Sequence, residues 1–323
     1  MPSAPDRLHR RALLLSAAAA LAAPQVVRAA ANVTPLPPMT EGPFYPEPTL
    51  GAGLTATSRG RHALAGTPAL TGRTTLWMLA ALLGLVALLL VGPLSVMASG
   101  EVDLHTPWYA KRQDRAGLAP DPAAEPGAVV QVYGARAVRW RGAFAIHPWI
   151  AVKPAGAPSY TTYQVIGWRA LRGGRTLVTT EGAEPDRYWY GAAPQLLAEH
   201  RGPAAQALIE RLEAAVQRYP WTDQYRAWPG PNSNTFVAWV AREVPELALD
   251  LPPNAIGKDW LGPTTFLAPA PSGTGWQISL WGVAGATLAR EEGLELQLLG
   301  LSLGVDVNDA RLRLPGWGWW GGP

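Results

Sequence analysis

An unbroken apolar stretch near the N-terminus constrains this chain more than any other feature. No residue from Thr74 to Gly100 carries a charge, and Leu76–Met97 alone is 22 residues long. Because a helix rises about 1.5 Å per residue, about 20 residues cross the hydrocarbon of a bilayer. Trp77 stands at one end of the stretch, where interfacial indoles concentrate. A buried core helix is the alternative, but such helices seldom lack charge over this length. We therefore predict a transmembrane helix over 75–97.

The segment before this helix has the pattern of an export signal. The chain opens with three arginines, namely Arg7, Arg10 and Arg11. An apolar run over 12–23 follows, and small residues at 29–31 offer a cleavage site. The adjacent arginine pair is typical of twin-arginine export, although an alanine-rich N-terminus with arginines also arises by composition alone. We predict an export-signal-like leader over 1–31 and a disordered linker over 32–74.

The charges that flank the apolar stretch are balanced, so they orient the helix only weakly. Within about 20 residues, each side carries three basic residues, which is a tie under the positive-inside rule. The nearest charges are Arg73 and Glu101, which favour an N-terminal side in the cytoplasm. A cleaved leader would favour the reverse. We expect a single-pass protein of the cell inner membrane with the large domain in the periplasm.

A short segment behind the leader carries a resemblance of its own. The sequence TEGPFYPE, at 40–47, resembles the start of the intradiol dioxygenases, which are non-haem iron enzymes that open catechol rings. The resemblance is confined to residues 1–47. That family holds its iron with two tyrosines and two histidines in a later β-sandwich, and no matching cluster follows here. We therefore carry over no iron and predict neither a metal site nor a cofactor.

The distribution of charge excludes one class of partner, and the absence of cysteine excludes several kinds of site. The net charge of the chain is +3, but residues 1–100 hold seven arginines and only three acidic residues, a net +4. Residues 101–323 therefore carry a net charge of −1, whereas a nucleic-acid binder carries its positive charge on the folded domain. The chain contains no cysteine, which rules out disulfides, thiolate metal sites and a cysteine nucleophile. We expect the membrane, and no nucleic acid, as a partner.

The rest of the chain divides into a tether and one globular domain. Residues 98–126 form a Pro/Ala-rich tether, and the domain extends over 127–323. Apolar periodicity predicts strands at 129–133, 143–152, 160–168, 277–280 and 294–303, and helices at 203–219 and from 232 or 233 to 244. Strands followed by helices and further strands indicate the α+β class.

Trp228–Phe236 contains the strongest candidate for chemistry. Proline and glycine lead into a small hydroxyl side chain, Ser233, where a helix begins. A helix N-terminus favours developing negative charge, and His147, on a strand upstream, could act as general base. The alternative is that Ser233 or Asn232 only caps the helix and that His147 is a half-buried, hydrogen-bonded histidine.

Several tracts of the domain resemble one bacterial family. They are Val130–Tyr133, His147–Lys153, Trp228–Phe236 and Ala255–Asp259. Through them residues 127–314 resemble domain-of-unknown-function family 3750, a membrane-associated family that has no assigned reaction. The resemblance thus implies a setting at the membrane but no chemistry.

A second resemblance concerns the candidate site itself. Circularly permuted papain-like (NlpC-like) proteins, including lecithin retinol acyltransferase and the permuted deSUMOylating peptidases, place a strand histidine first and an N-C-x-x-F helix start later. His147 and Asn232–Phe236 stand at the matching positions, with Ser233 in place of the cysteine. The resemblance implies an α+β, permuted papain-like domain behind one transmembrane helix, with Ser233 as nucleophile, His147 as base and Asn232 beside them.

The serine leaves two hypotheses for function. A hydroxyl is far less acidic than a thiol and needs more assistance from a base. One hypothesis is a Ser/His hydrolase or acyltransferase of the cell envelope. The other is a non-catalytic envelope module with a degenerate site that binds a peptide, a glycan or a lipid.

Overall fold

The computed structural model describes residues 72–321, all within one compact unit of the chain. The predicted leader over 1–31, the dioxygenase-like segment within 1–47 and nearly all of the predicted linker over 32–74 lie outside the described residues.

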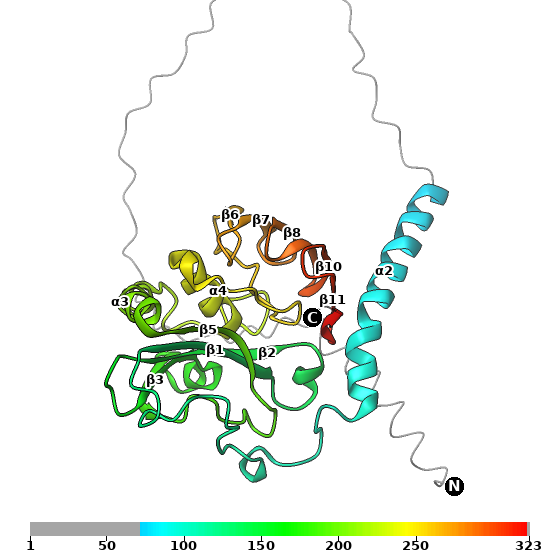
Figure 1. Ribbon diagram of the computed structural model, residues 1–323. Helices are drawn as coiled ribbons and strands as arrows, with labels where there is room; N and C mark the ends of the chain where they lie inside the picture. The colour runs from blue at the N-terminus through cyan, green and yellow to red at the C-terminus, as the bar shows by residue number, and fades with distance from the viewer. Residues whose placement is uncertain (1–71, 322–323) are drawn as a thin grey trace, which may run out of the picture. The chain divides into compact units, whose positions relative to one another are not determined.

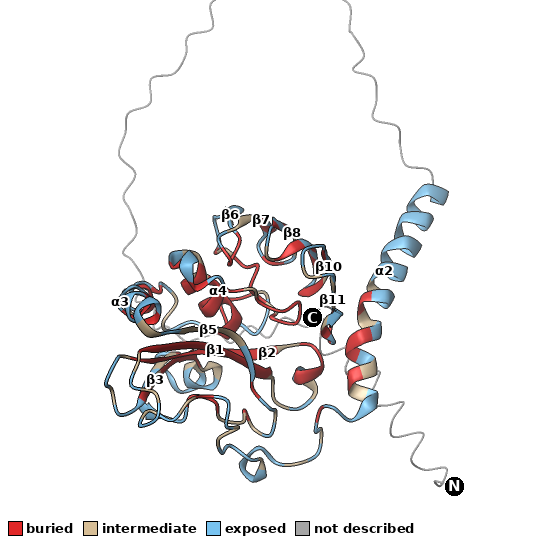
Figure 2. Cartoon of the chain, viewed as in Figure 1, coloured by how far each residue is buried: buried red, intermediate tan, exposed pale blue. Residues whose placement is uncertain are grey.

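The predicted apolar helix is present as α2, Gly72–Ser99. It is the one helix of the described part that is long and apolar enough to cross a membrane, with a mean hydropathy of 2.5. Its two halves differ in their surroundings (Figures 1 and 2). The N-terminal half is exposed, whereas Leu89, Gly92, Pro93 and Val96 are buried against the domain.

Residues 129–201 form a five-stranded antiparallel sheet in the order β4-β3-β2-β1-β5. Its strands are β1 (Val129–Arg136), β2 (Ile146–Lys153), β3 (Tyr160–Val165), β4 (Leu177–Ala183) and β5 (Gln195–Arg201). The first three were predicted. The predicted ends at 143 and 168 fall instead in short 3-10 helices, η2 (Arg139–Ala143) and η3 (Gly167–Arg172).

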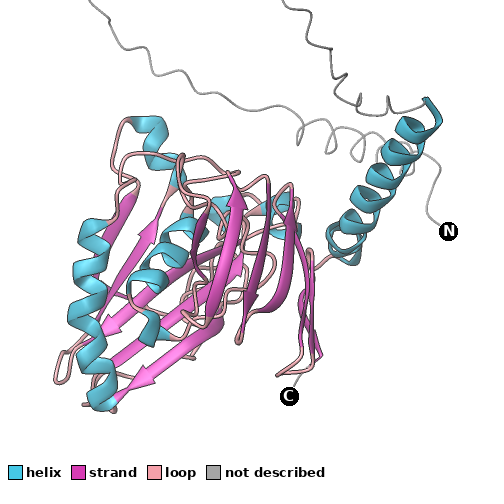
Figure 3. Ribbon diagram, turned by 90° about the horizontal axis from the view of Figure 1, so that it is seen from above, coloured by secondary structure: helices cyan, strands magenta, loops and turns pink. Residues whose placement is uncertain are grey.

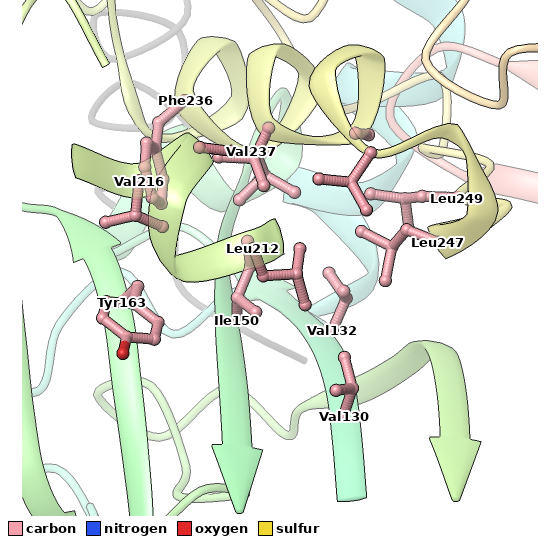
Figure 4. Packing of buried hydrophobic residues seen from close by; sticks show 14 of the residues in the cluster. Val130, Val132, Ile150, Tyr163, Leu212, Val216, Phe236, Val237, Leu247 and Leu249 are labelled. Atoms are coloured by element: carbon pink, nitrogen blue, oxygen red, sulfur yellow. The ribbon is translucent and has the colours of Figure 1, made fainter. Parts of the chain in front are cut away.

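Two helices, α3 (Gly202–Arg218) and α4 (Ser233–Glu243), cover one face of this sheet (Figure 3). Pro203 opens α3 at the first helical turn, where its missing N–H costs nothing. Figure 4 shows strand side chains meeting helix side chains in the main core. Its members include Val132, Ile150, Leu212, Val216, Phe236 and Val237.

A second, aromatic cluster lies on the opposite face of the five-stranded sheet. It contains Tyr133, Trp149, Tyr160 and Trp189. Part of the predicted tether over 98–126 is hydrogen-bonded to the segment that carries this cluster, because the amides of Leu118 and Ala119 both donate to Asp186. A 3-10 helix, η1 (Trp108–Ala110), lies earlier in the region predicted as a tether.

After α4 and the 3-10 helix η4 (Pro245–Leu247), the chain forms a seven-stranded antiparallel meander in simple sequence order. Its strands are β6 (Leu267–Pro269), β7 (Gly275–Leu280), β8 (Ala284–Ala289), β9 (Gly293–Leu298), β10 (Leu301–Asp306), β11 (Arg311–Leu314) and β12 (Gly318–Gly321). The strand predicted over 294–303 is two strands, because Leu299 and Gly300 turn with φ of 53° and 80°. Two antiparallel sheets with packed helices confirm the predicted α+β class.

Candidate functional site

Asn232 is the N-cap of α4 and holds its first turn. Its side-chain oxygen accepts from the backbone N–H of Asn234 at 2.9 Å and of Thr235 at 3.0 Å. The Thr235 hydroxyl in turn accepts from the Asn232 N–H at 3.2 Å, which completes a capping box. Two of the orphan amides at the start of the helix are thus satisfied by one side chain.

The same two asparagines tie the helix start to distant parts of the chain. Asn232 Nδ2 donates to the carbonyls of Ala227 at 3.0 Å and Ile256 at 2.9 Å. Asn234 Nδ2 donates to the carbonyls of Ile256 at 2.9 Å and Ile146 at 3.2 Å. Three of the sequence tracts that carry the family resemblance, or residues adjoining them, therefore meet at this junction.

Gly257 allows the close approach. Its φ is +89°, and a Cβ there would lie 2.4 Å from Asn232 Nδ2. A larger residue would therefore clash with the cap as well as strain the backbone.

Ser233 follows the cap and is only 4% exposed. Its hydroxyl forms no hydrogen bond with any residue between 72 and 321. It stands at the N-terminus of α4, on the face of the five-stranded sheet that the helices cover.

His147 lies on the other face of the same sheet. Its strand neighbours Ile146 and Ile150 point into the helix-covered core, while Trp149 belongs to the aromatic cluster. Because side chains alternate along a strand, His147 shares the face of Trp149. Its ring stacks on Trp189, with centroids 3.7 Å apart and planes within 10°.

The structure therefore does not bring Ser233 and His147 together. No hydrogen bond joins the two side chains within the described range, and His147 Nε2 pairs instead with Gln164 Oε1 at 3.1 Å. Since an amide oxygen only accepts, this contact places the ring proton on Nε2. No catalytic role for Ser233, His147 or Asn232 is tested by these contacts, so all three roles stay predictions.

Burial also sets the protonation of His147. It lowers the pKa of the imidazole to about 3, and the Gln164 hydrogen bond opposes the shift while Arg187 adds to it. A general base works best when its pKa lies near the operating pH. A ring with a pKa this low is neutral at physiological pH but only weakly basic.

The aromatic cluster continues outward to the surface. Trp168 stacks on Trp189 at 5.9 Å, and Tyr190 contacts both Trp168 and Trp108 edge to face. We call the outermost members, Trp108, Tyr109, Trp168 and Tyr190, the aromatic surface. Trp168 is 42% exposed, and the rings of Trp108 and Tyr109 are more exposed still. The sequence shows a high tryptophan content after residue 100, but no spacing that would have gathered these four rings.

A buried ion cluster joins the α4–β6 segment to the seven-stranded sheet. Lys258 Nζ lies 2.8 Å from Glu295, and Arg313 bonds both Glu295, at 3.3 Å, and Asp250. Burial alone would raise the pKa of Glu295, but Lys258 and Arg313 outweigh it and hold that pKa below its usual value. Sequence reasoning missed this cluster because its members are far apart in the chain.

The fold and the candidate site together define an α+β domain next to an apolar helix. Residues 127–260 match the family model described as Protein of unknown function (DUF3750), and this part of the chain belongs to that family. The match ends at Trp260, before the seven-stranded sheet begins. No curated protein and no solved structure matches the chain.

Proposed function

We propose that the chain is a single-pass protein of the cell inner membrane, anchored by α2, with its large domain in the periplasm. The exposed N-terminal half of α2, which carries no charge beyond Arg73 in its first turn, supports the anchor, because an apolar helix that the domain does not bury is stable in hydrocarbon. Arg73 in the first turn of α2 and Glu101 just after its end favour the periplasmic side for the domain.

The domain, in this proposal, is a non-catalytic envelope module that keeps a permuted papain-like arrangement with a degenerate site. The chain order supports the arrangement, since a strand with His147 precedes a helix that begins at Ser233 and packs on that strand. Loss of catalysis is favoured by the serine at the nucleophile position and by the placement of His147 on the far face of the sheet.

The ligand binds at the aromatic surface, and its proposed class is a glycan. The observation that carries this is the run of stacked rings from His147 through Trp189 to the exposed Trp168. Flat aromatic faces offer apolar contact to sugar rings, and Arg112 and Arg187, which lie over Tyr188 and Trp189, supply hydrogen-bond donors beside them.

Binding of soluble cell-wall glycan fragments, measured by calorimetry, tests the module. Trp168→Ala should abolish binding, whereas Leu171→Ala should leave it unchanged. Leu171 is a matched control because it lies on the same 3-10 helix and is 71% exposed. Equal binding by the two variants would refute the aromatic surface as the site.

A fluorophosphonate serine probe tests the competing hydrolase hypothesis. We expect Ser233 to remain unlabelled, because no base among residues 72–321 forms a hydrogen bond with its hydroxyl. Labelling of Ser233 that is lost in His147→Ala would establish the enzyme instead of the binding module.

A further inference from the structure

In the seven-stranded sheet the exposed face is apolar and the buried face carries polar side chains, which is the reverse of a sheet in a water-soluble protein. Residues of one row across it are paired neighbours and all exposed, between 37% and 69%. This outer row is Trp276, Leu288, Leu294, Val305, Leu312 and Trp320. The next row along the strands points inward and is buried, although it contains Gln277, Thr287, Glu295 and Arg313.

The outer face contains no charged residue on any of the seven strands. The charged residues within the strands, Glu295, Asp306, Arg311 and Arg313, all occupy the inward register. A second outer row, with Ile278 and Leu296, is equally apolar. Soluble monomers rarely expose contiguous apolar patches larger than a few hundred Å², so this face requires an apolar partner.

Helix α2 lies on this same outer face. Leu298 and Leu301, which are paired on the outer face of β9 and β10, form a cluster with Leu89 and Val96 of α2. Gly92 packs so closely on the backbone of Pro315, after β11, that a Cβ there would overlap it. The uncovered part of the outer face is therefore continuous with the surface of α2.

The length of uncovered helix indicates how deep the bilayer must reach. The part of α2 before its first buried residue, Leu89, is 72–88, which is 17 residues or about 25 Å at about 1.5 Å per residue. The hydrocarbon is about 30 Å thick. A membrane crossed by α2 therefore reaches the level at which the helix lies against the sheet.

From this continuity we propose that the outer face of the seven-stranded sheet lies in one leaflet of the lipid bilayer beside α2. The proposal rests on the proposed membrane-spanning role of α2. The sheet does not cross the bilayer, because strands of at most six residues extend only about 20 Å and the edge strands β6 and β12 keep unpaired backbone groups. Trp276 and Trp320 lie near the two ends of the outer row, and indoles suit the membrane interface.

Site-directed labelling of the full chain tests this proposal, and the absence of native cysteine makes each label unique. Four variants carry an environment-sensitive fluorophore on a single cysteine: Leu83→Cys in α2, Leu288→Cys and Leu296→Cys on the outer face, and Leu171→Cys as the control. All four leucines are exposed, so none of the substitutions opens a cavity. The labelled chain is reconstituted in phosphatidylcholine vesicles, and quenching by spin-labelled phosphatidylcholine is compared with quenching by aqueous iodide.

We expect labels at 83, 288 and 296 to emit at shorter wavelength and to be quenched by the spin-labelled lipid, and the label at 171 to be quenched by iodide. Lipid quenching at 83 with iodide quenching at 288 and 296 would overturn the sheet proposal and leave the anchor in place. Iodide quenching at 83 would overturn the anchor and, with it, this proposal. Protection of 288 and 296 from both quenchers would mean that another protein surface, such as a second copy, covers the face, and would also overturn it.

Discussion

The protonation of His147 makes a quantitative prediction about stability. The folded imidazole has a pKa of about 3, against an ordinary value of 6.5 that the unfolded chain regains. Below pH 6.5 the His147 ring therefore binds a proton in the unfolded state but not in the folded state, so the free energy of unfolding falls as the pH falls. The slope is about 1.4 kcal/mol per pH unit between the two pKa values. Acidification from about pH 7.5 to about pH 5 should thus remove about 2 kcal/mol through this one ring.

The variant His147→Gln isolates that contribution. Glutamine keeps a donor for Gln164 but does not titrate, so the variant is less stable at neutral pH yet loses less stability on acidification. Urea unfolding of the full chain in detergent, followed by tryptophan fluorescence, gives both values, because 14 of the 15 tryptophans lie after residue 100. The difference in pH dependence between wild type and variant cancels the contributions of all other groups.

The nuclear magnetic resonance titration of the ring provides the direct check. The C2 proton of His147, assigned by its loss in the variant, should not shift between about pH 8 and about pH 4, because its pKa lies lower still. A midpoint near 6.5, or the same acid sensitivity in both proteins, would refute the reasoning. It would mean that the ring is hydrated and available as a base.

Three further predictions concern the elements around the site. Asn232→Ala should cost at least about 1 to 2 kcal/mol, because the cap is lost together with two bonds that brace the helix start, and urea unfolding measures it. Leu212→Ala in the main core should cost about 2 to 5 kcal/mol by the same assay, with Leu171→Ala near neutral as the exposed control. Glu295→Gln leaves Lys258 and Arg313 without their shared charge, so it should cost about 3 to 5 kcal/mol; a neutral result would mean that water reaches the cluster.

Local signals in the sequence predicted the helices of the domain well. Pro203 begins α3 and Asn232 begins α4 because the first-turn proline and the N-cap are satisfied by nearby backbone alone. Strands β4 and β5 were missed because their exposed, polar residues show no alternation of apolar and polar side chains. Their pairing depends on neighbouring strands that are distant in sequence.

The candidate pair could not be placed from sequence because both faces of β2 are buried. All eight residues of β2 are buried, so the pattern does not reveal which face His147 occupies. A shift of one residue along the strand would exchange the two faces. The core memberships of Ile146 and Trp149, together with the stacking of His147 on Trp189 more than forty residues away, place the ring on the face opposite α4.

In the seven-stranded sheet, the alternation of apolar and polar residues predicts the strands correctly but does not tell which side is buried. Trp276, Ile278 and Leu280 alternate with Gln277 and Ser279, and that alternation correctly indicates a strand. The usual reading turns the apolar side inward, because water is the assumed solvent. Here the polar side is buried against the ion cluster, and the apolar side is left open.

The inverted polarity follows from the buried ion cluster on one side of the sheet and from the proposed lipid on the other side. Lys258 belongs to the family domain and is buried, so the sheet that packs on it must supply a carboxylate, and Glu295 does so from the inward register. Strand alternation then sends the residues beside it, Leu294 and Leu296, to the outside. Such an outer face is costly in water but favourable in lipid, and α2 already lies on it. The proposed placement of α2 and the sheet at the membrane therefore accounts for the apolar outer face and for the polar residues buried behind it.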